Sequence, residues 1–298
     1  MTPNAKYPGW YAGDNRRLFE MMSIFLNLAP DYIEPSMVEA ITGGNRDFSE
    51  YAYASLAASA CGLDVYENKE DKRFFGKSFL PMFRLLDPEK YRADPYYRNI
   101  RFPTGTQGKW TFRTQTCKPY EAFVYDDPEI SGDAFQGYRV IPRIGFFEEA
   151  YDYPAVLENG REWMTLMPNE TQTSGEAVRR ARGSVLTFGL GLGYFTYMAA
   201  RKPEVASVTV VELSPDVIAL FREHILPQFP HPEKVKLVQS DAFAFCEQGL
   251  RDYDMIFADI WHDPSDGVDL YLRFKEYEKK NPGPDYVYWL EKTLELYL

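Results

Sequence analysis

The chain of 298 residues is 45% hydrophobic and 26% charged, the balance of a globular protein with one large domain or two modest ones. It has 33 Lys and Arg and 44 Asp and Glu, which gives a net charge of −11. A negative charge argues against nucleic acid and anionic membranes as partners and favours a neutral or cationic small molecule. Solubility alone also explains an acidic surface. Three cysteines are too few for a disulfide framework, no apolar run reaches the roughly 18 residues of a membrane span, and residues 1–17 lack a signal-peptide pattern, so we expect a cytoplasmic protein.

The first half of the chain has the pattern of helices followed by short strands. Residues 14–90 repeat apolar side chains at helical spacing and predict a helical segment. Short strands are predicted in KWTFRTQ and YEAFVYDD, and DDPEISGDAFQG at 126–137 has the composition of a turn-rich linker. We therefore predict a mostly helical N-terminal lobe with a strand and loop linker over residues 1–138, and a second domain over residues 139–298.

The second domain begins with a predicted hairpin and continues as alternating strands and helices. Asn159-Gly160 separates two apolar runs within residues 139–168, which is a strong hairpin signal. The alternation after Pro168 predicts a Rossmann-like α/β fold, with a parallel sheet covered by helices on both faces. The expected strands are 184–189, 207–212, 234–239 and 254–259, and the expected helices are 193–201, 215–226 and 242–250.

Three glycines, Gly189, Gly191 and Gly193, follow the first of these strands in the run LTFGLGLGYF. Glycine at the end of a parallel strand lets the backbone turn sharply and lets a ligand approach closely. A dinucleotide fingerprint has the spacing G-x-G-x-x-G/A, but Tyr194 stands here in place of its last small residue. The loop therefore favours a nucleoside ligand over a dinucleotide.

Acidic residues end the next two strands. Glu212 ends the second strand, 19 residues after Gly193, and a carboxylate there can accept hydrogen bonds from both hydroxyls of a ribose. Ser240-Asp241-Ala242 ends the third strand. Asp241 can accept a hydrogen bond from an exocyclic amine such as that of adenine, or cap the helix that follows, and the two roles are compatible.

Four stretches, VLTFGLGLGYFTYMA, VTVVELSPDVI, VKLVQSDAFAF and YDMIFADIW, resemble in order and spacing the first four motifs of class I S-adenosylmethionine-dependent methyltransferases. The likeness covers roughly residues 183–262 and implies S-adenosylmethionine as the cofactor. By resemblance, the glycine loop faces the methionine part of the cofactor, Glu212 the ribose and Asp241 the adenine. The cofactor-binding residues are then Thr187, Gly189, Gly191, Gly193, Tyr194, Glu212, Leu213, Asp241, Ala242 and Asp259.

The chain departs from the family at one position and shares a further feature with one of its subgroups. The family often has an acid two residues before the first glycine, where this chain has Thr187. The stretch LENGREWMTLMPNETQTSGEAV is similar to the hairpin of the spermidine synthase subgroup, and this likeness implies that Glu170 and Thr171 lie at the edge of the cofactor cleft. Glu170 is equally suited to the start of a helix, where the helix dipole favours an acid.

Methyl transfer to a hydroxyl or amine requires orientation of the reactants and a base near the transfer point. The stretch ADIWHDPSDG follows the fourth strand, and we predict Asp259, His262 and Asp263 as catalytic residues, with Asp266 as a further titratable group. Tyr194 is the candidate ring beside the positive sulfonium.

The same stretch is similar to the corresponding stretches of two related enzyme classes. Its acid-to-Asp-Pro spacing is one residue longer than in aminopropyltransferases. It also resembles catechol O-methyltransferase, whose strand acid binds Mg²⁺, but the remaining ligands of that enzyme are not found, so no metal is predicted.

Only 39 residues follow Asp259, and VDLYLRFKEYEKK and DYVYWLEKTLELYL are both predicted to be helical. The sheet would then lack the last three of the family's usual seven strands, unless the N-terminal lobe, the 139–168 strands or a partner subunit completes it. The last helix would present Val287, Leu290, Leu294 and Leu298 either to a second copy in a homodimer or to its own sheet.

The sequence thus predicts an S-adenosylmethionine-dependent methyltransferase that acts on a small-molecule O- or N-acceptor, neutral or cationic. The alternatives are spermidine synthase-like aminopropyl transfer, NAD-dependent oxidoreduction and non-catalytic binding of S-adenosylmethionine. Tyr194 opposes the oxidoreductase, whereas Thr187 and the missing strands favour the non-catalytic protein.

Overall fold

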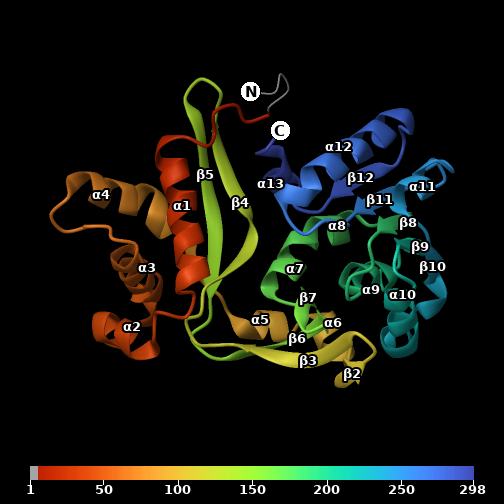
Figure 1. The fold of residues 1–298 in the computed structure, drawn as a ribbon, viewed down its shortest axis with the longest axis horizontal. Coiled ribbons are helices and arrows are strands. Elements are labelled where there is room, and N and C mark those ends of the chain that lie inside the picture. Colours follow the sequence, from red (N-terminus) through yellow and green to blue (C-terminus); the bar gives the residue numbers. More distant parts are fainter. Residues whose placement is uncertain (1–5) are drawn as a thin grey trace. The chain divides into compact units, whose positions relative to one another are not determined.

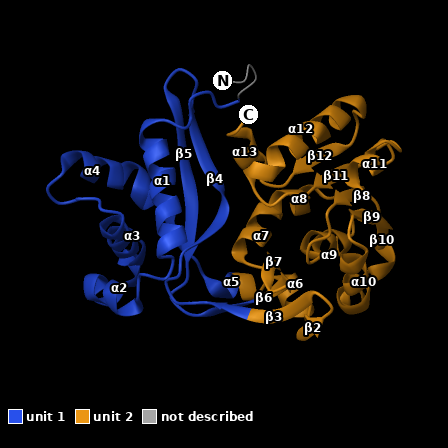
Figure 2. Cartoon of the chain, viewed as in Figure 1, with its two compact units in different colours: residues 1–90, 115–153 blue, residues 91–114, 154–298 orange. Residues whose placement is uncertain are grey.

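The computed structural model describes residues 6–298 and divides the chain into two compact units (Figure 2). One unit comprises the residues up to Lys90 together with 115–153, and the other comprises 91–114 together with 154–298. The first five residues, part of the stretch that lacks a signal-peptide pattern, lie outside the described residues. The division differs from the boundary expected after residue 138, because the chain passes between the units after Lys90, within β3 (Trp110–Cys117) and within β6 (Tyr151–Glu158).

The first unit combines helices with a three-stranded sheet in the order β1-β5-β4, of which Figure 1 shows the two long strands β4 and β5. β1 is parallel to β5, and β4 and β5 form an antiparallel hairpin. Its core is aromatic, with the rings of Tyr53 and Phe146 stacked at 3.8 Å between centroids. Its elements are α1 (Gly13–Leu28), α2 (Pro35–Thr42), α3 (Ser49–Ala60), α4 (Lys69–Phe74), β1 (Phe83–Leu85), β4 (Phe123–Asp133) and β5 (Gly137–Phe146), and α5 (Pro88–Arg92) leads out of it.

Two sequence predictions for this unit were wrong. Phe83–Leu85 is a strand, because it pairs with β5 and its backbone partners are more than fifty residues away along the chain. Residues 126–133 of the expected linker belong to β4. The register of β4 shifts between Asp126 and Glu129, and Pro128 lies in this irregular stretch, where a residue without an N–H is tolerated.

The second unit is built on five parallel strands in the order β10-β9-β8-β11-β12 (Figure 1), which confirms the predicted parallel sheet. The chain order reverses between β8 and β11, and ligands of open α/β sheets bind at such a switch point. The elements of this unit are α6 (Pro95–Asn99), β2 (Gly105–Gln107), β7 (Arg161–Thr165), α7 (Pro168–Thr173), α8 (Gly175–Arg180), β8 (Gly183–Phe188), α9 (Tyr194–Ala200), β9 (Val205–Glu212), α10 (Pro215–Leu220), β10 (Val235–Gln239), α11 (Ala242–Cys246), β11 (Met255–Ala258), α12 (Pro264–Lys280), β12 (Asp285–Tyr288) and α13 (Glu291–Glu295).

A hairpin precedes the parallel sheet. It belongs to a four-stranded sheet in the order β2-β3-β6-β7, in which β3 spans Trp110–Cys117 and β6 spans Tyr151–Glu158. Asn159 and Gly160 join β6 to β7 with φ angles of 50° and 80°. Positive φ at both positions is the requirement of the two-residue turn that Asn-Gly favours.

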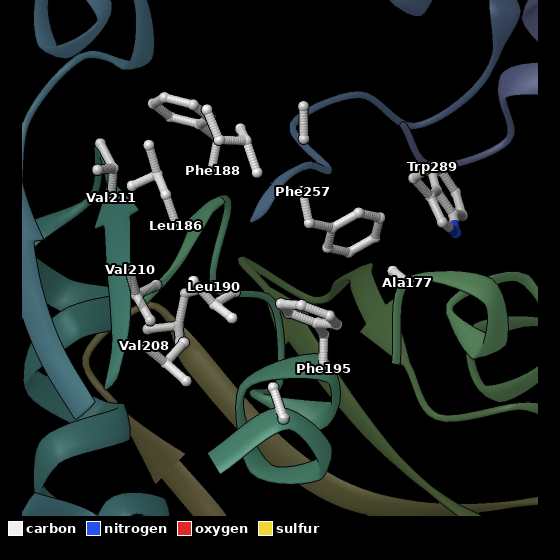
Figure 3. Packing of buried hydrophobic residues seen from close by; sticks show 14 of the residues in the cluster. Ala177, Leu186, Phe188, Leu190, Phe195, Val208, Val210, Val211, Phe257 and Trp289 are labelled. Carbon is white, nitrogen blue, oxygen red and sulfur yellow. The ribbon is translucent and has the colours of Figure 1, made fainter. Parts of the chain in front are cut away.

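The core of the second unit lies around β8 and β9, whose buried side chains include Leu186, Phe188, Val208 and Val210 (Figure 3). Strands of a parallel sheet are covered on both faces and therefore have nearly continuous apolar sequences. Phe195 of α9 packs on Phe257 of β11 at 4.5 Å between ring centroids. This packing fixes the carboxyl ends of the central strands, from which the candidate site is built.

The C-terminal prediction was wrong in one respect: Asp285–Tyr288 is a strand, and it pairs with β11 as the fifth strand of the sheet. Leu290 then has a left-handed backbone (φ 53°) and separates β12 from the short helix α13. Val287 and Leu294 are buried in the core of their own unit, and Leu290 and Leu298 pack against it. These side chains therefore serve the fold of this chain. In the described part, no helix combines the length and hydrophobicity that crossing a membrane requires.

Candidate functional site

A cleft of about 470 Å³ lies at the carboxyl ends of the parallel strands. The loops after all five strands contribute to it, and so do β7 and α7. From the sequence prediction, the cleft brings together Gly189, Gly191, Glu212, Leu213, Asp241, Ala242, Asp259 and His262, and also Glu170. The predicted residues that do not line this cleft are Thr171, Thr187, Gly193, Tyr194, Asp263 and Asp266.

The glycine loop has positive φ at all three glycines, but different neighbours restrict each one. A Cβ at Gly189 would lie 1.9 Å from the carbonyl oxygen of Asp259, and a Cβ at Gly193 would lie 2.3 Å from the ring of Phe221. At Gly191 the nearest atom is the flexible end of Met164, at 2.7 Å. Gly189 and Gly193 are thus required by packing within the fold, whereas Gly191 borders the cleft and leaves its backbone accessible.

Glu212 anchors the glycine loop from the end of β9. Its Oε2 accepts a hydrogen bond from the backbone N–H of Leu190 at 3.2 Å, and its Oε1 accepts one from Ser214 N–H at 2.8 Å. A carboxylate has about four lone-pair positions, so Glu212 retains acceptor capacity toward the cleft. The neighbouring Leu213 is 67% exposed and lines the same cleft, where it offers an apolar contact beside this acid.

Asp241 is the N-cap of α11. Its Oδ1 accepts hydrogen bonds from Phe243 N–H at 3.0 Å and Ala244 N–H at 2.9 Å. The capping role foreseen for it is therefore present. The side chain also lines the cleft together with Ala242, so capping does not remove it from the site.

Glu170 and Asp259 form a neighbouring pair of half-buried carboxyl groups that border the cleft. Burial, reinforced by the charge of Asp259, raises the pKa of Glu170 to about 8. Burial also raises the pKa of Asp259 to about 7, against the opposing influence of His262. Glu170 belongs to the first turn of α7 and Asp259 directly follows β11, and both border the cleft and a smaller cavity beneath the glycine loop.

The pKa values of Glu170 and Asp259 are higher in the folded chain than in the unfolded chain. Between the two sets of pKa values, the folded chain therefore binds more protons at these carboxyl groups than the unfolded chain does. The stability that they contribute is fully present below about pH 4 and is lost as the pH rises through about 7 to 8. We expect Glu170→Gln to gain stability relative to the wild type between pH 5.5 and 8.5, by on the order of 2 kcal/mol. Urea unfolding at a series of pH values measures this difference. A difference that does not change with pH would show that Glu170 ionises freely in the folded chain.

His262 borders the cleft on its exposed side and is paired with an acid. Its Nδ1 lies 2.9 Å from Oδ2 of Asp266, and the Asp266 carboxylate also accepts hydrogen bonds from the backbone N–H groups of His262 and Asp263. Asp263 is the N-cap of α12, and its Oδ1 accepts from Ser265 N–H. Of the predicted catalytic residues, Asp259 and His262 thus face the cleft, whereas Asp263 starts a helix.

Thr187 and Tyr194 lie beneath the glycine loop, where they line the smaller cavity. Thr187 is 1% exposed within β8. The hydroxyl of Tyr194 donates to Oδ2 of Asp94 at 3.0 Å, and burial raises the pKa of Asp94. Tyr96, in the first turn of α6 two residues after Asp94, donates a hydrogen bond from its hydroxyl to the carbonyl oxygen of Leu192 in the loop. Tyr194 is therefore tied to α6, which explains why it is absent from the lining of the main cleft.

Several lining residues were not predicted. Trp289 follows β12, and it was missed because residues 285–298 were expected to be helical. Trp261 lies within ADIWHDPSDG, where the prediction chose only the titratable residues. Its indole N–H donates a hydrogen bond to the carbonyl oxygen of Trp289 at 3.1 Å. The other unpredicted residues are Glu162, Trp163, Met164, Thr165, Asn169, Leu190, Val211, Ser240 and Ile260.

The cleft is lined by acidic side chains and by no basic side chain other than His262 among the described lining residues. Glu162, Glu170, Glu212, Asp241 and Asp259 border it, and none of the described lining residues is Lys or Arg. Within residues 6–298, no group of three or more His, Cys, Asp and Glu side chains has the arrangement of a metal site. A low-dielectric concavity of one sign concentrates ligands of the opposite charge, so the cleft suits a cationic ligand.

No protein-family model matches the sequence, and no curated protein shows significant sequence similarity to it. Solved structures with a similar arrangement include a protein described as a SAM-dependent methyltransferase from Streptococcus mutans, with 22% identity over 48% of this chain and 42% of its own, at a TM-score of 0.31. A protein described as an O-methyltransferase from Klebsiella pneumoniae matches with 24% identity over 37% of this chain and 50% of its own, at 0.29. Spermidine synthase from Thermotoga maritima matches with 14% identity over 41% of this chain and 49% of its own, at 0.30. The chain thus spans half or less of the length of these three proteins, and its function has to be argued from the chemistry of its own cleft.

Proposed function

We propose that this protein is an S-adenosylmethionine-dependent methyltransferase acting on a small molecule. The observation that carries the proposal is the arrangement of the acids around the glycine loop. Glu212 lies beside the loop and hydrogen-bonds to its backbone at Leu190, and Asp241 follows the next strand of the sheet. A ribose acceptor and an adenine acceptor on successive strand ends form a site for a nucleoside, and Gly191 lets that ligand approach the backbone.

The residues of the cleft suit the proposed cofactor. Glu212 has acceptor capacity left for ribose hydroxyls, Asp241 and Ala242 border the position of the base, and Leu213 offers an apolar face. Bound S-adenosylmethionine supplies an electrophilic methyl group on a positive sulfonium, which a negatively charged cleft stabilises. None of the described lining residues repels a cation.

The acceptor side of the cleft lies across the switch point from the nucleoside side. The strand order places β9 and β10 on one side of β8, and β11 and β12 on the other. Asp259, Trp261, His262 and Trp289 therefore border the acceptor side. There Asp259 or His262 removes the proton of a hydroxyl or amine acceptor, and the tryptophans supply apolar walls that exclude water.

Calorimetric titration of the purified protein with S-adenosylmethionine, S-adenosylhomocysteine and NAD tests this proposal. We expect both sulfur nucleosides to bind and NAD not to bind, because the G-x-G-x-G spacing of the loop departs from the G-x-G-x-x-G/A dinucleotide fingerprint. Binding of neither sulfur nucleoside would refute the proposal. Incubation with radiolabelled S-adenosylmethionine and a pool of cell metabolites then identifies the acceptor, and cofactor binding without any methylated product would indicate a non-catalytic binding protein.

Aminopropyl transfer is a second candidate, and the β6–β7 hairpin before the glycine loop and the negative cleft favour it. In that reaction an amine nitrogen attacks the propyl carbon next to the sulfonium, and the carbon–sulfur bond breaks with its electron pair remaining on sulfur. Decarboxylated S-adenosylmethionine with 1,4-diaminobutane is the test. Formation of the triamine would replace methyl transfer by aminopropyl transfer as the function of the cleft.

A further inference from the structure

An apolar pocket of about 30 Å³ lies next to the glycine loop in the second unit. The strands β3, β6 and β7 contribute four side chains to it, Trp110, Phe112, Val156 and Trp163. α10 and the π-helical turn that continues it, η4 (Phe221–Ile225), contribute another wall, and π-helical turns recur at functional sites. Apart from the indole N–H groups of the two tryptophans, every side chain that lines this pocket is hydrocarbon.

The apolar pocket is a neighbour of the cleft at the carboxyl ends of the parallel strands. Gly191 and Trp163 line both spaces, so these two residues form their common wall. Gly191 has no side chain that would separate the two spaces, and Trp163 is only half-buried. A small group of a ligand held in the cleft therefore lies within reach of the pocket.

Trp110 supplies the pocket with a buried polar atom that lacks a partner. The residue is 4% exposed, and its indole Nε1 has no hydrogen-bond acceptor among the described residues. Two contacts hold the ring: the Trp163 ring meets it edge to face at 5.0 Å between centroids, and Nζ of Lys109 lies 4.9 Å from its centroid. An unsatisfied buried donor destabilises a protein by about 1–3 kcal/mol. Its presence at a pocket therefore points to a ligand that brings the acceptor.

The size and chemistry of the pocket limit what can occupy it. A buried water makes about three hydrogen bonds, which hydrocarbon side chains and an indole N–H do not offer. A benzene ring fits an apolar cavity of roughly 150 Å³, so the 30 Å³ available here admits only an end group of a few atoms. An ionised end group is excluded, because no opposite charge lines the pocket to compensate it. What fits is a small apolar group with one oxygen acceptor.

We propose that the apolar pocket is a subsite for the methyl ketone end of a neutral ligand held in the cleft. The methyl group contacts the hydrocarbon side chains, and the carbonyl oxygen accepts a hydrogen bond from the indole N–H of Trp110. The identification of this ligand with the methyl acceptor rests on the proposed function. The acceptor is then a neutral carbonyl compound whose hydroxyl or amine lies in the cleft.

Titration with 2-butanone, a small methyl ketone, tests the subsite without any cofactor. Protein labelled with ¹⁵N in its five tryptophans gives an indole N–H signal for each of them, and Trp110→Phe identifies the signal of Trp110. We expect this signal to move downfield to a saturating value as the ketone oxygen accepts the hydrogen bond. A shift that grows without saturating would mean solvent effects only and would overturn the proposal.

Val156→Ile fills the pocket with one added carbon and retains the β-branched shape suited to a strand. The matched control is Val235→Ile, at a half-buried strand position outside the pocket. We expect Val156→Ile to lower the affinity for 2-butanone more than tenfold, about 1.4 kcal/mol, and Val235→Ile to leave it within twofold. Thermal unfolding of both variants checks that they are folded. Equal affinities in the two variants would disprove the subsite.

Trp110→Phe tests the hydrogen bond separately, because it keeps an apolar ring and removes the donor. Binding is then followed on the signal of Trp163 and should be weaker by about fivefold, the contribution of one neutral hydrogen bond. Unchanged affinity would refute the role of the indole N–H.

The subsite and the proposed function fail separately. If 2-butanone saturates the Trp110 signal and neither sulfur nucleoside binds, the proposed function fails and the subsite stands. If the nucleosides bind and the ketone does not, the subsite alone fails. Once the methylated product is identified, a product without a carbonyl group, or one that Val156→Ile forms as fast as Val235→Ile does, would overturn the identification of the ligand with the acceptor.

Discussion

Replacing Gly189 with alanine is expected to destabilise the second unit by about 3 kcal/mol or more. The added Cβ would lie 1.9 Å from the carbonyl oxygen of Asp259, a backbone atom that cannot turn aside, and φ at this position is +92°. Asp259 N–H also donates to the carbonyl oxygen of Phe188 at 2.9 Å, so relief of the collision would separate β8 from β11. Thermal and urea unfolding measure the loss.

Gly191→Ala is the matched control for this change. It also has a positive φ, +51°, but its Cβ would meet only the end of the Met164 side chain. We expect a loss of about 1 kcal/mol from the backbone strain, with Met164 moving aside. Equal losses for the two variants would mean that backbone strain, and not the carbonyl of Asp259, makes glycine necessary at position 189.

Replacing Glu212 with alanine is expected to weaken binding of S-adenosylhomocysteine by more than tenfold, about 1.4 kcal/mol. Two effects add: the ribose loses its acceptor, and the backbone N–H groups of Leu190 and Ser214 lose the carboxylate that holds them. Glu212→Gln retains only one acceptor oxygen and should fall between alanine and the wild type. Isothermal calorimetry on all three proteins gives the series.

Asp216→Asn is the control for Glu212. Asp216 is a neighbouring acid in the first turn of α10, outside the lining of the cleft. Its replacement should leave nucleoside affinity within twofold. Comparable losses at both positions would indicate a general effect of the negative charge, and the assignment of Glu212 to the ribose would then be withdrawn.

The central sheet was predictable because its signals are local. The apolar runs of β8 and β9, the glycines after β8 and the acids after β9 and β10 are all contiguous in the sequence, and parallel pairing brings their ends together. The positions of Gly189, Gly191, Glu212, Asp241 and Asp259 around one cleft follow from this pattern.

The elements that escaped prediction depend on distant pairing. In residues 285–298 the apolar spacing of Val287, Leu290 and Leu294 matches a helix, yet residues 285–288 pair with β11 and Leu290 breaks the helical path. Tyr194 was placed beside the cofactor on spacing alone, whereas its hydroxyl is bound to Asp94, a hundred residues earlier in the chain. No local pattern carries this information.

The same limit applies to Glu170. The residue stands in a short polar run where the start of a helix and a ligand site have the same composition. Only its partial burial in the cleft wall and its proximity to Asp259 distinguish the two interpretations. The sequence pointed to His262 because histidine ordinarily titrates near neutral pH, whereas the structure adds two carboxyl groups whose pKa values burial raises into the same range.

The contact of α6 with the glycine loop determines which fragments of the chain can retain an intact cleft. A fragment beginning at residue 139 would contain every motif of the parallel sheet but would lack Asp94 and Tyr96, which hold Tyr194 and the carbonyl oxygen of Leu192. Such a fragment would keep the strands of the parallel sheet but would lose these two hydrogen bonds to the glycine loop and to Tyr194. The cleft therefore cannot be isolated with the C-terminal half alone, and a fragment that keeps it intact has to include residues 91–114.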